Sequence, residues 1–247
     1  MTKLDIGIVS LFPEMIHLIA QYGVVGRSAD EELLTLSMYN PRDFTTDAYH
    51  KVDDKPYGGG PGMVMKYKPL ESAIKSAKKS MPKDCPVILM SPQGKRFDQK
   101  VARRFSKLPA MILVAGRYEG VDERFIENYV DEEISMGDFI LSGGEIAAMA
   151  IIDSVVRLLP GALGDDTSSV DESFENNLLE YPHYTRPEEV EGCFVPEVLL
   201  SGNHEAIKLW RSEQSLIRTY KKRPDLFGEL TEQQEIILNK YKQLIKD

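Results

Sequence analysis

The sequence predicts an α/β fold in which a parallel β-sheet is covered by helices on both faces. Short runs such as residues 86–90 and 110–115 are apolar throughout and have the length of strands. Helices are expected between and after these runs, at residues 99–106 and 121–129. Apolar strands that show no polar alternation and are separated by helices are typical of a parallel sheet buried on both faces.

The N-terminal part of the chain provides the first elements of this pattern. Residues 4–12 and 33–39 are predicted strands, and Pro13 opens a helix after the first of them. A further helix is expected from residue 69 to about residue 80. The segment 43–66 contains four glycines at positions 58, 59, 60 and 62. Such a segment is either a flexible loop or a stretch of backbone that approaches another group closely.

Three predicted strands end in polar or glycine-containing loops, at residues 91–94, 116–120 and 137–144. The third loop belongs to the stretch 134–164, which reads as a strand, a loop with paired glycines, and an apolar helix stopped by a Pro-Gly pair. Alone, this stretch also fits an ordinary strand–helix connection. Because ligands of open α/β sheets bind at the carboxyl ends of the strands, three such loops together favour a ligand pocket.

The chain changes character after residue 162. The next residues are polar and lack periodicity, as expected for a linker. Beyond them the sequence predicts a helix capped by Asn203 and a final helix from about residue 231 to residue 245. We therefore expect a domain at 1–162, a flexible linker or lid at 163–177, and a small helical domain at 178–247.

Composition and charge narrow the class of protein. The chain has 42% hydrophobic and 28% charged residues, typical of a soluble globular protein, and a net charge of −9. This charge argues against non-specific coating of nucleic acid, although a local basic patch for one RNA stays compatible with it. No apolar run approaches the roughly 18 residues of a membrane helix, and the N-terminus has no signal-peptide pattern. Cys85 and Cys193 are expected to be free thiols in the cytoplasm.

Common nucleotide and metal signatures are missing from the sequence. It contains no G-x-G-x-x-G after a strand and no G-x-x-x-x-G-K-[ST], which argues against the usual dinucleotide and P-loop sites. No Cys/His cluster has metal-ligand spacing, so we assign no metal ligands. The four histidines have no evident partners and are expected to be structural or exposed: His17, His50, His183 and His204.

Five multi-residue motifs carry a family resemblance. They are VDDKPYGGGPGMVMK, SPQGKRF, GRYEGVDER, ISMGDFILSGGE and LLEYPHYTRP, which begin at residues 52, 91, 116, 134 and 178. In this order and spacing, over nearly the whole chain, they resemble the bacterial tRNA (guanine-N(1)-)-methyltransferases, the TrmD family of the SPOUT class. The resemblance implies methylation of the guanine immediately 3′ of the anticodon, which supports reading-frame maintenance. It also implies a trefoil knot in the C-terminal part of the sheet, a rare exception to unknotted topology.

Carried over by motif, the resemblance implies a site for the methyl donor S-adenosylmethionine at the three strand-end loops. Such loops offer backbone N–H and C=O groups, and their glycines let a ligand lie against the main chain. The implied donor-binding residues are Ser91, Pro92, Gly116, Tyr118, Glu119, Gly120, Met136, Gly137, Asp138, Phe139, Ile140, Leu141, Gly143, Gly144 and Ala147.

Methylation of guanine N-1 requires a general base for the N-1 proton and a cation near O6, where negative charge develops. The family's base is an aspartate in the sequence D-S-F, and Glu172 stands at that position here, in VDESF. We expect Glu172 to be the base, with the adjacent Asp171 as the alternative. The family's arginine maps to Arg157, which is expected to polarise O6 and orient the carboxylate. Without the resemblance, Arg157 would be read as a charge that complements the helix dipole.

The resemblance further implies a tRNA anticodon stem-loop as substrate, a homodimer with the active site between subunits, and no membrane partner. Six basic residues are candidates for contact with tRNA phosphates, or else form a solvated helix face: Lys208, Arg211, Arg218, Lys221, Lys222 and Arg223. Magnesium is kept open as a second cofactor because activity in the family is associated with it. Two alternative functions are a different SPOUT RNA methyltransferase and a non-catalytic RNA-binding protein with this fold.

Overall fold

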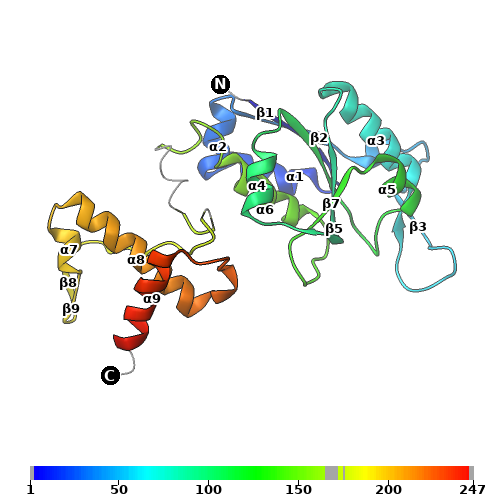
Figure 1. Ribbon diagram of the computed structural model, residues 1–247. Helices are drawn as coiled ribbons and strands as arrows, with labels where there is room; N and C mark the ends of the chain where they lie inside the picture. Colours follow the sequence, from blue (N-terminus) through cyan, green and yellow to red (C-terminus); the bar gives the residue numbers. More distant parts are fainter. Residues whose placement is uncertain (1–2, 165–171, 175, 245–247) are drawn as a thin grey trace. The chain divides into compact units, whose positions relative to one another are not determined.

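The computed structural model describes residues 3–164, 172–174 and 176–244 (Figure 1). The chain divides into two compact units, Met1–Asp166 and Thr167–Asp247. The elements of the first unit are β1 (Leu4–Val9), α1 (Pro13–His17), η1 (Leu18–Gln21), α2 (Gly23–Asp30), β2 (Leu34–Tyr39), η2 (Pro41–Phe44), β3 (Asp53–Asp54), β4 (Val64–Met65), α3 (Tyr67–Ser80), β5 (Val87–Arg96), α4 (Gln99–Phe105), β6 (Ala110–Ala115), α5 (Glu123–Tyr129), β7 (Glu132–Ser135) and α6 (Glu145–Val156).

Five strands of the first unit form one sheet in the order β2-β1-β6-β5-β7. Every neighbouring pair in this sheet is parallel. The predicted α/β fold with a central parallel sheet is therefore confirmed. The trefoil knot implied by the resemblance stays a prediction.

The middle strand β6 shows why the sheet strands are apolar throughout. Its alternate side chains enter two separate cores: Met111 and Leu113 on one face, Ile112 and Val114 on the other. The first core also contains buried residues of α1, α2, α4 and α6, and the second contains those of α3 and α5 (Figure 1). Because both faces are covered, neither set of side chains alternates with polar residues.

The strand predicted at residues 86–90 is longer than expected. It continues as β5 to Arg96, and both Met90 and Lys95 pair with Ile134 of β7, so the residues between them form a bulge. A Cβ at Gly94 would overlap the backbone of Glu133. The segment 91–94 is thus an irregular part of a strand rather than a free loop, because glycine permits close approach to the neighbouring strand.

The glycines of segment 43–66 lie between the two strands of a short antiparallel pair, β3 and β4. The backbone N–H of Met65 donates to the Gly120 carbonyl at 2.9 Å, and that of Glu119 donates to the Met63 carbonyl at 2.9 Å. A Cβ at Gly62 would overlap the Glu119 side chain. Close approach to another group is therefore observed at Gly62, which lies against the loop after β6. Gly58, Gly59 and Gly60, in contrast, have open space where a Cβ would stand.

The second unit is helical, with a short hairpin. Its elements are β8 (Glu189–Val190), β9 (Cys193–Phe194), α7 (Glu197–Leu200), α8 (His204–Lys222), η4 (Pro224–Leu226) and α9 (Glu232–Leu244). The Asn203 side chain caps α8 by accepting a hydrogen bond from the Ala206 N–H at 3.1 Å, as predicted. Among the described residues, no helix has both the length and the apolar character needed to cross a bilayer.

Candidate active site

A cavity of about 630 Å³ lies where β6 and β7 end, beside the bulged part of β5. The loops that follow β6 and β7 line it together with residues 89–93 of β5, as expected near the carboxyl edge of a parallel sheet. Every predicted donor-binding residue except Asp138 is part of its lining. The structure thus brings together residues that are up to 56 positions apart in sequence, between Ser91 and Ala147. Their role in holding a donor stays a prediction.

The walls of this cavity combine held backbone with exposed apolar side chains. The Gly144 N–H donates to the Gly116 carbonyl at 2.9 Å, which joins the loop before α6 to the loop after β6. The Ser135 hydroxyl accepts from the Gly137 N–H at 3.1 Å. Phe139 and Ile140 are 56% and 82% exposed, although both are large and apolar. Exposed apolar side chains at a cavity are typical of a surface that a ligand or partner covers.

Beneath the cavity lies a buried charged network that sequence reasoning missed. Glu145, at the first position of α6, is fully buried and accepts a hydrogen bond from the Ser10 hydroxyl at 2.9 Å. Its second carboxylate oxygen lies 2.8 Å from Nε of Arg117, and the contact is an ion pair without hydrogen-bond alignment. The only sequence signal was an acidic residue directly after paired glycines, at the start of an otherwise apolar helix.

Arg117 connects this network to the cavity, which its side chain helps to line. Its guanidinium donates to the Ser142 carbonyl at 3.2 Å and lies 4.6 Å from the centre of the Phe12 ring. Ser10, Arg117 and Glu145 belong to the end of β1, the loop after β6 and the start of α6. A buried carboxylate and one arginine therefore hold three segments in fixed register around the cavity.

The two predicted catalytic residues belong to different units. Arg157 is half-buried at the C-terminal cap of α6 in the first unit. Glu172 is half-buried in the second unit and lines a cavity of about 570 Å³ together with Lys208 and Arg211. Asp171, the alternative base, lies outside the described residues.

Two of the histidines have polar partners in the structure. His183 Nε2 lies 2.8 Å from a carboxylate oxygen of Glu180, and His50 Nδ1 lies 2.9 Å from the Thr45 hydroxyl. Neither partner was evident from the sequence, because both partners are local and polar but not part of a recognised motif. Both histidines are exposed, in line with the expectation of a structural or exposed position. Within the described ranges, no group of three or more His, Cys, Asp or Glu side chains is arranged to hold a metal ion.

Comparison with known proteins decides the family. The model of the family tRNA (Guanine-1)-methyltransferase TrmD matches residues 4–229. The chain belongs to this family. It is 55% identical to a tRNA (guanine-N(1)-)-methyltransferase of Hahella chejuensis over 245 residues, 98% of this chain and 95% of that protein. A protein of the same name from Idiomarina loihiensis is 53% identical over 240 residues, 96% of this chain and 95% of the relative.

The six basic residues that the TrmD resemblance marked for tRNA lie on α8 or at its end. Their settings differ. Arg211 lies over the ring of Tyr181 at 4.7 Å and lines the cavity of Glu172, as does Lys208. Arg223 instead forms an ion pair with Asp225 at 2.7 Å, and this carboxylate raises the pKa of Arg223. Lys208 and Arg211 are therefore the two of these six residues that line the same cavity as Glu172, a predicted catalytic residue.

Proposed function

We propose that this chain methylates N-1 of the guanine immediately 3′ of the anticodon in tRNA, with S-adenosylmethionine as methyl donor. The observation that carries the proposal is a TrmD match over residues 4–229 together with a cavity at the strand ends that the TrmD donor motifs line. Relatives at 53–55% identity are named tRNA (guanine-N(1)-)-methyltransferase. The product supports reading-frame maintenance, and we expect the enzyme to act in the cytoplasm.

The cavity fits the donor in size and in chemistry. Its volume of about 630 Å³ lies within the roughly 300–1,000 Å³ of small-molecule sites. Gly120 has a φ of 151° and open space where a Cβ would stand, so backbone is accessible to a ligand there. Loops 116–120 and 136–144 would hold the donor, with Ser91 and Pro92 beside them. When bound, S-adenosylmethionine supplies an electrophilic methyl group.

The chemistry of the acceptor assigns roles to Glu172 and Arg157. N-1 of guanine carries a proton, and its removal places negative charge on O6. We assign the Glu172 carboxylate to take this proton and the Arg157 guanidinium to stabilise the charge on O6. The target base must leave its stack so that N-1 can face the methyl group. Asp171 stays the alternative base.

We further propose that the active enzyme is a homodimer, in which the donor cavity of one subunit is completed by Glu172 and the helical unit of the other. Exposed apolar side chains of the first unit support a subunit interface, because large apolar side chains are usually covered. Phe12, Leu18 and Tyr22 are 46%, 51% and 71% exposed. In this scheme residues 163–177 act as a lid between the domain 1–162 and the small domain 178–247. The basic residues of α8 would contact tRNA phosphates. We derive no step from magnesium.

Mass spectrometry of nucleosides from methylated tRNA tests this function. The chain with tRNA and S-adenosylmethionine should produce 1-methylguanosine. Glu172→Ala and Arg157→Ala should each reduce turnover by roughly 10²–10⁴-fold while donor binding, measured by calorimetry, is unchanged. Glu172→Asp should retain activity, since the carboxylate is shortened by one methylene but kept.

Other outcomes would change the assignment. A 2′-O-methyl or uridine product would indicate a different SPOUT methyltransferase. No donor binding at micromolar concentration would leave a non-catalytic RNA-binding protein. If Asp171→Ala is inactive while Glu172→Ala is active, Asp171 is the base.

A further inference from the structure

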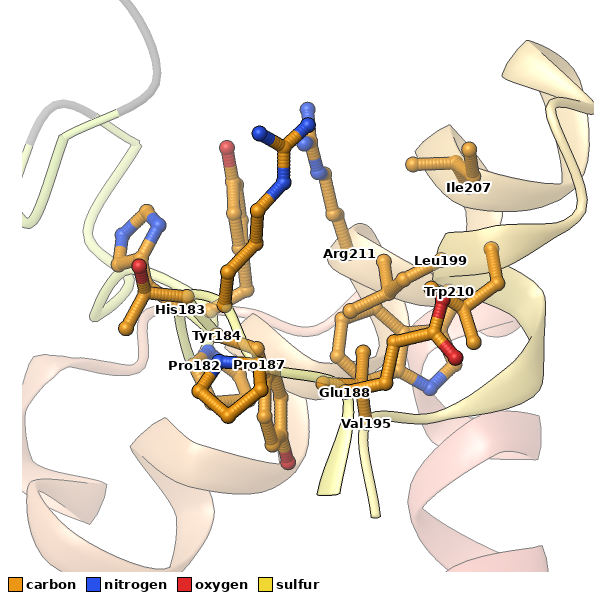
Figure 2. A pocket seen from close by; sticks show the side chains of 14 residues that line it. Pro182, His183, Tyr184, Pro187, Glu188, Val195, Leu199, Ile207, Trp210 and Arg211 are labelled. Carbon is orange, nitrogen blue, oxygen red and sulfur yellow. The ribbon is translucent and has the colours of Figure 1, made fainter. Parts of the chain in front are cut away.

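A second cavity, outside the proposed donor site, lies entirely within the second unit. It has a volume of about 960 Å³ and is formed by residues 181–188, Val195 and side chains of α7 and α8. Figure 2 shows side chains of the segment 182–188 facing those that project from the helices. Apart from Arg211, none of the residues assigned above to donor, base or tRNA contact lines this cavity.

Two consecutive residues of α8 each meet an aromatic ring of the segment opposite. The Trp210 ring lies 6.4 Å from that of Tyr184, with an angle of 52° between the planes. The Arg211 guanidinium lies 4.7 Å over the ring of Tyr181. Tyr184 is 49% exposed, and Tyr181 and Trp210 are half-buried. Three aromatic rings therefore line one cavity and keep exposed surface, which is typical of a stacking platform.

The charges around this cavity favour an anionic ligand with a flat ring. Arg186 and Arg211 both line it and are exposed. Of the acidic residues nearby, Glu188 lines the cavity, whereas Glu180 contacts His183 at 2.8 Å. Aromatic faces combined with arginines are the features by which proteins bind unpaired nucleotides, through base stacking and phosphate contact.

This cavity adjoins the one that Glu172, the proposed base, lines. It shares Tyr181, Ile207 and Arg211 with the cavity that Glu172 lines. A nucleotide held on the aromatic rings would therefore lie next to the space that Glu172 faces within the same unit. If the target guanine occupies the space at Glu172, the nucleotide on the aromatic rings is the one adjacent to it in the RNA strand.

We propose that this aromatic cavity binds an unpaired nucleotide of the RNA substrate next to the target guanine, with the base stacked on the exposed ring of Tyr184 beside Trp210 and the phosphate at Arg186 and Arg211. This role rests on the proposed function. It adds a second contact between the chain and the same RNA. The cavity thereby selects single-stranded loop RNA over duplex, since bases within a duplex cannot reach the rings.

Trp210 gives a direct readout, since it is the sole tryptophan of the chain. Its fluorescence is measured while the full-length chain is titrated with an anticodon stem-loop RNA and, separately, with a duplex RNA of equal length without a loop. We expect quenching by the stem-loop and not by the duplex. Bound stem-loop, shown by anisotropy of a labelled RNA, without any change in Trp210 fluorescence would overturn the proposal.

Substitutions separate stacking from a general effect on folding. Tyr184→Leu should weaken stem-loop binding about tenfold, whereas Tyr184→Phe should restore it because the ring is kept. Phe227→Leu is the matched control: Phe227 is an aromatic residue of the second unit that lines neither cavity, so RNA affinity should not change. Equal affinities of Tyr184→Leu and the unsubstituted chain would refute the stacking contact.

A second variant covers the case in which Tyr184→Leu does not fold. Arg186→Ala changes an exposed side chain and should weaken stem-loop binding and reduce its salt dependence by about one phosphate contact. An unchanged salt dependence would argue against the phosphate contact. Nucleoside mass spectrometry keeps the two proposals apart. Formation of 1-methylguanosine without a Trp210 response removes only the aromatic cavity. A Trp210 response without 1-methylguanosine removes the methyltransferase assignment and leaves the cavity as an RNA contact without a target guanine.

Discussion

At the scale of single residues, the most informative finding is a buried carboxylate beneath the proposed donor cavity. Glu145 is fully buried, lies 2.8 Å from Arg117 and accepts a hydrogen bond from Ser10. A charge removed from water in this way stabilises the fold only while its partner stays in place. The contact therefore ties the position of Arg117, on the cavity wall, to the packing of α6.

We predict that Glu145→Gln destabilises the chain by about 3 kcal/mol, because it leaves the Arg117 charge without its counter-ion. It should also weaken donor binding, since Arg117 lines the cavity. Urea denaturation and calorimetry measure the two effects. Ser10→Ala is the control, with an expected loss of about 1–2 kcal/mol for the two hydrogen bonds of its hydroxyl, to Glu145 and from the Phe12 N–H. Equal losses for the two variants would show that the ion pair is not what stabilises this site.

The two cysteines should differ sharply in reactivity. Burial raises the pKa of the Cys85 thiol to about 11, whereas Cys193 is exposed on β9. We predict that a thiol reagent at pH 8 modifies one thiol per native chain and two after denaturation. The Cys193→Ser variant should give none in the native state. Rapid labelling of Cys85 in that native variant would show that its site opens readily.

At the scale of elements, a carboxylate links α3 to α5. Glu71 of α3 accepts hydrogen bonds from Lys75 at 2.8 Å, Lys68 at 2.9 Å and, from α5, Tyr129 at 2.8 Å. These hydrogen bonds lower the pKa of Glu71 from 4.5 to about 2. Since the folded-state pKa is depressed, the stabilisation is complete above pH 4.5 and is lost as the pH falls toward 2.

We therefore predict that Glu71→Gln lowers the melting temperature at pH 7 and that the difference from the unsubstituted chain shrinks between pH 4.5 and pH 2. Thermal unfolding followed by circular dichroism over this pH range is the measurement. Tyr129→Phe, which removes one hydrogen bond but keeps the carboxylate, should show a smaller pH dependence. A difference in melting temperature between Glu71→Gln and the unsubstituted chain that stays constant down to pH 2.5 would contradict the lowered pKa of Glu71.

Elements were predictable where a single segment decides its own structure. The apolar run of β6, the Asn203 cap of α8 and the Pro-Gly stop after α6 are local signals, and the strand and helices appear where expected. The continuation of β5 to Arg96 was not predictable, because it depends on pairing with β7 about 40 residues further along the chain. Polar residues there have strand geometry only because a partner strand satisfies their backbone.

At the scale of the whole molecule, the two units differ in how much they bury. Both hydrophobic cores belong to the first unit. Of the hydrophobic residues described in the second unit, only Leu216 and Leu238 are fully buried. Because buried apolar area is the main source of stability, the second unit should unfold more easily.

We predict two unfolding transitions in urea. Trp210 fluorescence reports the second unit, and labelling of Cys85 in a Cys193→Ser background reports the first. The Trp210 midpoint should lie at the lower urea concentration, because fewer apolar side chains must be exposed. Coincident midpoints would show that the two units unfold as one cooperative body.

By itself, the sequence determined the parallel α/β class, the segments that line the proposed donor cavity and the family to which the chain belongs. These depend on local patterns and on motifs whose order is preserved along the chain. Only the tertiary structure decided the network of Ser10, Arg117 and Glu145 and the aromatic cavity of Tyr184 and Trp210. The physical reason is that both depend on side chains that are distant in sequence, and no local pattern records which distant residue will be a neighbour.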